Sequence, residues 1–355
     1  MRPLLFALAG ALLAAGCAGT GGSPAPEQPA AAAAGETTPA TSALDDELAV
    51  SMTGWKTDFS KHTVSLSEFQ PGGPGKDGIP AIDAPAFVGS SGAADWLEPR
   101  EPVIELELGG EARAYPLQIL IWHEIVNDEV AGTPVAVTFC PLCNTALAFD
   151  RRVGGRELTF GTTGNLRNSD LVMYDRQTES WWQQFGGEAV VGDLAGARLS
   201  QVPARIVAWE DFARRHPDGL VLSRETGFSR NYGTNPYVGY DDVDTGPFFP
   251  AENSSDLRLP PKERVVFLDR GDDVVAISFS TLERKKTVRV TVGGDRLEAT
   301  WVPDVRSALD SSAIDEGRTV GSARVRSLET GEPVPFDTPF WFAVAAFRLD
   351  ARIVR

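Results

Sequence analysis

Turn-forming residues constrain this chain more than any other feature of its sequence. Of its 355 residues, 35 are Gly and 25 are Pro, about one residue in six, against a usual fraction of roughly 12%. Pro breaks helices and Gly weakens them, so this density leaves little room for long helices. The sequence therefore predicts an α+β fold that is predominantly β, with many short strands and hairpins and a few short helices.

Two glycine pairs, Gly109-Gly110 and Gly154-Gly155, mark predicted β-hairpins. A two-residue hairpin turn needs a positive φ, which Gly adopts without strain. The flanking segments are the predicted strands: residues 101–108, 111–115, 146–153 and 156–161. Short helices are expected elsewhere, over residues 116–127 and 209–216, and a buried strand over residues 135–139.

A faint internal match raises the possibility of two pseudo-repeated halves. Residues 101–120 can be laid on residues 263–282 with shared Glu, Val, Leu, Gly and Ala positions. Two unrelated hairpins with glycine turns would also look alike, and both interpretations stay open. In a true repeat the second copy would lack Cys and His, so the chemistry would belong to the first half.

The N-terminal residues predict an exported lipoprotein. Residues 4–15 are uncharged and follow Arg2, but they are too few to span a bilayer and suit the apolar region of a signal peptide. Small residues before Cys17 resemble a bacterial lipobox, in which Cys17 would carry lipid such as palmitate and become the new N-terminus. The alternative is an ordinary signal peptide with an incidental cysteine.

These features divide the chain into a signal peptide (residues 1–16), a lipidated Cys with a disordered Ala/Pro/Gly/Thr tether (17–47) and a single domain (48–355). Within the domain, residues 48–250 hold the chemistry and residues 251–355 serve as scaffold. The tether lacks large apolar residues and cannot bury enough surface to fold. The expected location is a bacterial membrane surface facing the periplasm or the exterior.

Net charge limits the partners of this chain. Its 49 Asp and Glu against 33 Lys and Arg give a formal charge of −16. A nucleic-acid binder needs a basic face to contact phosphates. Nucleic acid is therefore excluded as a partner, and the expected membrane contact runs through the lipid.

The strongest chemical signal is Cys140-Pro141-Leu142-Cys143. If Cys17 is lipidated, these are the only thiols of the mature protein, in a compartment where disulfides persist. A disulfide across so small a ring is easily reduced, whereas a structural disulfide normally closes a longer loop. The pair therefore favours thiol–disulfide redox chemistry with an unknown partner over a structural role. A strand, not a helix, is expected after Cys143, so the fold is not thioredoxin-like.

A lipoprotein that binds copper(I) or a small ligand is the competing hypothesis, and a scaffold with a structural disulfide is a further one. Cys140, Cys143 and His123 could together hold Cu(I), which soft thiolates select. Structural zinc usually takes four N or S ligands, and the three His of the chain are scattered. The redox hypothesis needs no cofactor, whereas the alternative needs copper. Neither defines a reaction, so the sequence leaves open whether the protein is an enzyme.

Five further residues are candidates for supporting the cysteines. His123 and Glu124 could place an acid–base pair beside the thiols, and the polar segment with Arg167, Asn168 and Asp170 could shape the site. Each has a structural alternative. A lone His on an apolar segment is often a packed core residue, and Asn and Asp often satisfy turns locally.

Several motifs in one order resemble the bacterial family called domain of unknown function 3179, over about residues 72–347. They are residues 76–80, 122–128, 139–143, 149–152, 167–170, 174–176, 259–264 and 340–347. The family has no settled activity. The resemblance also implies a selenocysteine at the Cys-x-x-Cys in some members, which supports the redox hypothesis. Residues 284–310 fit the pattern less well, which leaves the role of the second half open.

Overall fold

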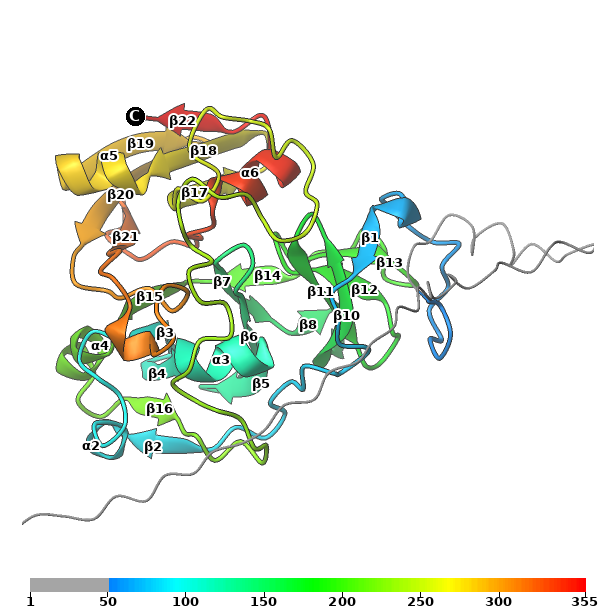
Figure 1. The fold of residues 1–355 in the computed structure, drawn as a ribbon, viewed down its shortest axis with the longest axis horizontal. Coiled ribbons are helices and arrows are strands. Elements are labelled where there is room, and N and C mark those ends of the chain that lie inside the picture. Colours follow the sequence, from blue (N-terminus) through cyan, green and yellow to red (C-terminus); the bar gives the residue numbers. More distant parts are fainter. Residues whose placement is uncertain (1–50) are drawn as a thin grey trace, which may run out of the picture. The chain divides into compact units, whose positions relative to one another are not determined.

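The computed structural model describes residues 51–355, which are predominantly β (Figure 1). Strands make up 40% of the structure and helices 12%, and the short strands lie in small sheets arranged like a five-bladed β-propeller. The predicted β-rich composition with a few short helices is confirmed, whereas the propeller-like arrangement was not anticipated. The predicted signal peptide (residues 1–16), Cys17 and the tether (residues 17–47) lie outside the described residues.

The first predicted glycine hairpin is confirmed and lies in a five-stranded sheet. The strands in order across this sheet are β15 (Ala204–Ala208), β3 (Pro102–Leu108), β4 (Glu111–Pro116), β16 (Leu220–Leu222) and β2 (Phe87–Gly89). Gly109 and Gly110 turn between β3 and β4 with φ of 58° and 84°, values that strain any residue with a Cβ. Helices α2 (Ser90–Ala93) and α4 (Trp209–Arg215) pack beside this sheet, α4 close to its predicted span.

A four-stranded sheet follows, in the order β14 (Ser200–Val202), β7 (Thr145–Asp150), β6 (Thr133–Cys140) and β5 (Ile125–Val130). The helix predicted over residues 116–127 is shorter, α3 (Leu117–His123). It ends where Glu124 takes a φ of 59°, and the β-branched Ile125 and Val126 pair with β6 instead. The apolar run suited either element, and burial in the sheet decided between them.

The second predicted hairpin is smaller than expected. Gly154-Gly155 does turn between two strands, but these are only β8 (Arg152–Val153) and β9 (Arg156–Glu157). Residues 146–150 belong instead to β7, which pairs with β6. The main-chain N–H of Arg152 bonds to the Asp150 carboxylate (2.9 Å), so the chain already turns two residues after β7 ends.

A third sheet brings in the polar segment around Asp170. Its strands in order are β1 (Phe69–Pro71), β10 (Phe160–Arg167), β11 (Asp170–Asp175), β12 (Trp181–Gln183) and β13 (Glu188–Val191), and η1 (Leu66–Glu68) precedes β1. The buried Trp181 fixes one face of this sheet through edge-on contacts with other aromatic rings, including Phe59 and Phe69 with centroids 5.2 Å away. Such aromatic burial anchors the sheet to the segment before it.

The last two sheets are three-stranded. One is β17 (Val265–Arg270), β18 (Asp273–Ser278) and β22 (Arg352–Val354), and the other is β19 (Thr287–Val292), β20 (Asp295–Val302) and β21 (Ser322–Ser327). Their helices are α5 (Phe279–Lys285), η2 (Ile314–Glu316) and α6 (Trp341–Phe347). Residues 223–264, which link β16 to β17, form no helix or named strand.

Two modules of the chain share one topology: the first spans residues 99–150 and 200–222, the second residues 261–302 and 322–354. Each has a hairpin, a seven-residue helix, strands of six and eight residues, and later a seven-residue helix with a strand parallel to the hairpin. Equivalent hydrogen bonds begin the later helices, from Trp209 N to Glu101 O and from Trp341 N to Glu263 O, both 2.9 Å. The faint sequence match falls on the opening hairpins of these modules.

The modules differ at two connections, and one of them is residues 151–199, which carry β8 to β13 and follow β7 in the first module alone. In the first module, residues 141–144 join β6 to β7 as a tight turn, and this turn holds Cys143. In the second module, the equivalent strands β20 and β21 are joined by the much longer segment 303–321. Cys143 therefore lies in the second of the connections where the modules depart from each other, and Cys140 directly precedes it.

Candidate functional site

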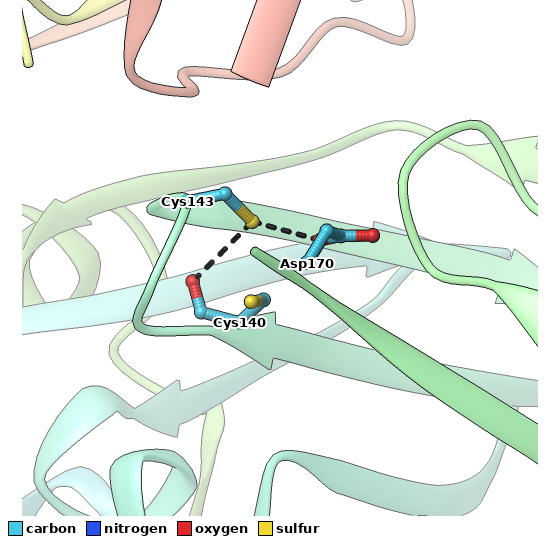
Figure 2. Close-up of side chains that lie close together, drawn as sticks. All are labelled: Cys140, Cys143 and Asp170. Atoms are coloured by element: carbon cyan, nitrogen blue, oxygen red, sulfur yellow. Dashed lines mark hydrogen bonds between the residues drawn. The ribbon is translucent and has the colours of Figure 1, made fainter. Parts of the chain in front are cut away.

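Cys140, Cys143 and Asp170 meet at a buried point between two sheets (Figure 2). Cys140 ends β6, Cys143 lies in the turn to β7, and Asp170 begins β11. Asn144 completes the turn with a φ of 58°, a conformation that Asn tolerates better than most residues. The two cysteines are thus held by a strand-to-strand turn, and no helix N-terminus follows Cys143.

The three side chains form a close group. One ligand atom from each, Sγ of both cysteines and a carboxylate oxygen of Asp170, lies within 4.8 Å of the others. Cys143 Sγ donates to Asp170 Oδ1 (2.8 Å) and lies 2.9 Å from Thr145 Oγ1. Both cysteines are free thiols, and their exposed fractions are 1% for Cys140 and 0% for Cys143.

A polar network fixes the other atoms of the site. Asp170 Oδ2 accepts from Gln183 Nε2 and from Phe185 N (2.9 Å). Thr145 Oγ1 donates to Gln184 Oε1 (2.6 Å), and Gln184 Nε2 donates to Thr138 Oγ1 (2.9 Å). Buried polar groups of this kind hold a fixed geometry when every member is satisfied.

The cysteine turn is also held from distant segments. Tyr240 donates its hydroxyl to Leu142 O (2.8 Å), and Phe340 N donates to Cys143 O (2.9 Å). Asn144 Nδ2 donates to Thr338 O (2.8 Å). The segment 223–264 and the start of α6 therefore determine the shape of the turn, because they occupy its backbone carbonyls and the side chain at its end.

The electrostatics of the site favour neutral acids. Burial, then the hydrogen bond with Cys140 and the charge of Asp170, raises the pKa of Cys143, and burial likewise raises that of Cys140. Burial raises the pKa of Asp170 as well. Burial and then Asp170 raise the pKa of Glu124 to about 8, with no cationic contribution. A buried thiol with a raised pKa is a poor nucleophile.

Asp337 belongs to the same acidic region, although sequence reasoning missed it. Its Oδ1 accepts from Ala146 N (3.0 Å) and Thr338 N (2.7 Å), while its buried Oδ2 has no hydrogen-bond partner in the described structure. Burial raises the pKa of Asp337 to about 7 against these two bonds, and the charge of Asp170 adds to the rise. Asp337 comes from the second module, so no local motif could have pointed to it.

His123 does not join the cysteine group. Its Nδ1 bonds to Pro80 O (2.7 Å) and its Nε2 to the Tyr232 hydroxyl (2.6 Å). Burial lowers the pKa of His123 and favours the neutral ring. His123 thus ties α3 to the segment before β2 and to the segment 223–264.

The other predicted supporting residues divide between the site and its surroundings. Arg167 forms an ion pair with Glu68 and donates to Gln183 Oε1 (3.4 Å). Gln183 in turn donates to Asp170, so it connects Arg167 to the site. Asn168 Oδ1 accepts from Glu252 N (3.0 Å) and therefore holds the segment 223–264. Glu124 lines a pocket next to the cysteine turn. Gln183 and Gln184 lie in a polar segment that is conspicuous in the sequence. Their partners lie on other strands, so their roles could be assigned only from the fold.

That pocket has a volume of about 210 Å³ and is lined mainly by apolar side chains. Leu142, between the two cysteines, contributes to its wall, as do Tyr237 and Phe249. Phe248 also lines it and is 62% exposed, so it marks the opening to solvent.

A second group of potential metal ligands, Glu105, Glu107 and His216, has an ordinary explanation. Glu105 forms ion pairs with Arg205 and Arg215, so its charge is already neutralised. The group of Cys140, Cys143 and Asp170 forms no ion pair within the described part of the chain. Of these two groups, only the latter therefore combines ligand geometry with the lack of a cationic partner.

Fold and site together define a propeller-like β protein with a buried dithiol–carboxylate centre. Residues 76–351 match the model of a protein family described as "Protein of unknown function (DUF3179)", and the chain belongs to this family. Comparison with curated proteins and with solved structures finds no match to either.

Proposed function

We propose that this domain binds Cu(I), with the thiolates of Cys140 and Cys143 as ligands and the carboxylate of Asp170 as a third. The observation that carries the proposal is the group of three acidic ligand atoms within 4.8 Å of one another at a fully buried position. Soft thiolates select Cu(I) and zinc, and three grouped ligand atoms are one fewer than structural zinc usually takes.

The protonation of the site makes metal binding dependent on pH. Ionised groups are costly to bury unless a partner of opposite charge is present. Asp337 has no cationic contribution to its pKa, and it lies near Asp170. Cu(I) binding would release the two thiol protons, and its single positive charge would offset one of the two thiolate charges formed, so affinity should rise with pH.

The ligand set differs from that expected on sequence. The copper hypothesis included His123, whose two ring nitrogens bond to Pro80 and Tyr232. Asp170 takes its place beside the sulfurs. Gln183 and Phe185 N would orient the Asp170 carboxylate, which is the role that outer hydrogen bonds play at metal sites.

The test is a titration of the reduced chain with Cu(I), without oxygen, against a coloured Cu(I) chelator. A Cys17→Ser background leaves Cys140 and Cys143 as the only thiols. One Cu(I) per chain is expected, with binding lost in Cys140→Ser and Cys143→Ser and weakened about tenfold or more in Asp170→Asn. Failure to take Cu(I) from the chelator, or equal binding by Cys140→Ser, would rule the site out. Tighter binding of zinc than of Cu(I) in a parallel competition would assign the site to zinc instead of copper.

Thiol–disulfide redox chemistry is the second candidate, and the proximity of the two Sγ atoms favours it. Burial of both sulfurs disfavours attack by a protein thiolate, so a small oxidant or thiol is the expected partner. The test is equilibration in glutathione buffers of graded potential, with the oxidation state read by mass spectrometry. A reversible transition supports redox work, whereas a bond that resists millimolar glutathione indicates a structural disulfide.

We also propose that the protein is exported and lipid-anchored through Cys17, with residues 17–47 as its tether. This rests on the sequence before residue 48. Among the described residues, no helix has the length and apolar character to cross a membrane. Membrane fractionation of the native chain and of Cys17→Ser tests the anchor. The native chain should be in the membrane fraction and the variant should not; a variant that stays there would contradict the proposal.

Finally, we propose that the two modules arose by internal duplication and that the second serves mainly as scaffold. Their shared order of elements and equivalent hydrogen bonds support this. Asp337 is the exception, because it brings a carboxylate of the second module to the cysteine turn.

A further inference from the structure

We propose that the pocket beside the cysteine turn binds a small quaternary ammonium group, with Glu124 as its counter-ion. The proposal is independent of the copper centre, because Glu124 is not among the three grouped ligand residues. It concerns a second site in the same region of the fold.

The side chain of Glu124 is the first reason. Only 7% of this residue is exposed, and its carboxyl group makes no hydrogen bond or ion pair within the described part of the chain. A buried carboxyl without a partner is costly and indicates a missing group of opposite charge. Glu124 lines the pocket, so a ligand there can supply that group.

The rest of the wall determines the kind of cation. Tyr237, Phe248 and Phe249 line the pocket, and most other wall residues are apolar or glycine. Such a wall offers few acceptors for the N–H groups of a primary ammonium ion. A methylated ammonium needs none, and aromatic rings attract it through their π faces. A volume of about 210 Å³ is small for a ligand site and suits a headgroup of this size.

No lysine or arginine among the described residues lines this pocket. Lys262 lies close to one ring of this rim, with Nζ 5.8 Å from the Phe248 centroid, and closer to Tyr240 outside the pocket, 3.9 Å from its centroid. Lys262 donates to Tyr240 O and to Thr245 Oγ1 (2.7 Å), so it is already held away from Glu124. The same contact shows that rings of this segment can lie against a cation.

The test compares choline with its uncharged isostere 3,3-dimethylbutan-1-ol by calorimetry on the full chain. Choline is expected to bind, and the isostere to bind about tenfold more weakly, since the ion pair and cation–π contacts are lost. Glu124→Gln should weaken choline about tenfold and leave the isostere unchanged. Phe249→Leu, which keeps the carboxylate, should weaken choline severalfold and guards against misfolding of the first variant.

Equal binding of choline and the isostere would overturn the proposal, as would unchanged choline binding by Glu124→Gln. Phosphatidylcholine vesicles, compared with phosphatidylglycerol vesicles, decide whether the ammonium comes from a lipid headgroup or a free molecule. The double variant Cys140→Ser, Cys143→Ser should bind choline normally while it loses Cu(I). The two sites can therefore fail separately.

Discussion

Cys143 Sγ donates a hydrogen bond to Asp170 Oδ1 across 2.8 Å, although neither residue has any exposed surface. The two residues come from different sheets, the β6–β7 turn and the start of β11. Their protons are therefore coupled, since ionising either group places a negative charge beside the other without water to screen it.

Asp170→Asn should lower the pKa of both thiols, because the negative charge of Asp170 contributes to raising each of them. An Asn oxygen can still accept from Gln183 and Phe185 N. Alkylation of the Cys17→Ser chain, followed across pH, should show its midpoint at lower pH in this variant. Asp193→Asn, an exposed control paired with Lys61, should leave the midpoint in place. An unchanged midpoint in Asp170→Asn would contradict the coupling.

Glu124→Gln should flatten the pH dependence of stability. The folded pKa of Glu124 is about 8 against an ordinary value of 4.5. Below pH 4.5 the carboxyl group is mainly neutral in the folded and unfolded states alike. As pH rises from 4.5 towards 8 it ionises only in the unfolded state, so the free energy of unfolding falls by about 4 to 5 kcal/mol in all. Denaturant unfolding at several pH values measures this slope. Glu129→Gln, on the exposed side of β5, should keep the wild-type slope, and a Glu124→Gln slope equal to it would refute the assignment.

Asp337→Ala should destabilise the fold by about 2 to 4 kcal/mol, because it leaves the buried N–H groups of Ala146 and Thr338 without their acceptor. Asp337→Asn retains an acceptor oxygen and should cost much less. Thermal unfolding of the two variants at pH 5 measures the difference, at a pH where the carboxyl of the folded protein is mainly neutral. Equal losses would show that the hydrogen bonds are not the main contribution.

Tyr240→Phe should loosen the cysteine turn, because it removes the hydroxyl that donates to Leu142 O (2.8 Å). A loss of about 1 kcal/mol is expected, with faster alkylation of Cys140 and Cys143. Tyr237→Phe is the matched control, since it removes a hydroxyl of the same segment without breaking a hydrogen bond to the turn. Equal alkylation rates in Tyr240→Phe and wild type would show that the turn does not depend on this bond.

His123→Gln should leave Cu(I) affinity within about threefold of wild type, since Asp170, not His123, lies beside the sulfurs. It should lower stability instead, because the bonds to Pro80 O and the Tyr232 hydroxyl connect three segments. The Cu(I) competition assay and denaturant unfolding, done together, separate these effects. A large loss of copper affinity at unchanged stability would restore His123 as a ligand.

The local parts of the fold could be predicted from the sequence. Gly109-Gly110 fixed a hairpin because a positive φ is a local requirement. The end of α3 could not be located, because Ile125 and Val126 are apolar in a pattern that suits helix and strand alike. Only pairing with β6 resolved that choice.

The candidate site divides in the same way. Cys140 and Cys143 stand out by their spacing, and Asp170 lies in a segment of conspicuous polarity. The contact between the cysteines and Asp170 depends on how the sheet of β6 and β7 packs against the sheet of β11, which no local pattern specifies. Asp337 is far from Ala146 in the chain, and no residue near it signals the contact. His123 illustrates the opposite error, because a rare residue close to the motif has its partners elsewhere.

The unequal connections of the two modules have a further consequence. The short link of residues 141–144 brings sulfur to the interior, while the position equivalent to Asp337 in the first module is Arg205, which pairs with Glu105. The thiols and Asp337, which accepts from Ala146 N next to the cysteine turn, are thus contributed by non-equivalent places in two similar folds. Joining two identical copies of either module would give two sulfur turns facing arginine, or none at all. The centre depends on how far the copies have diverged from each other.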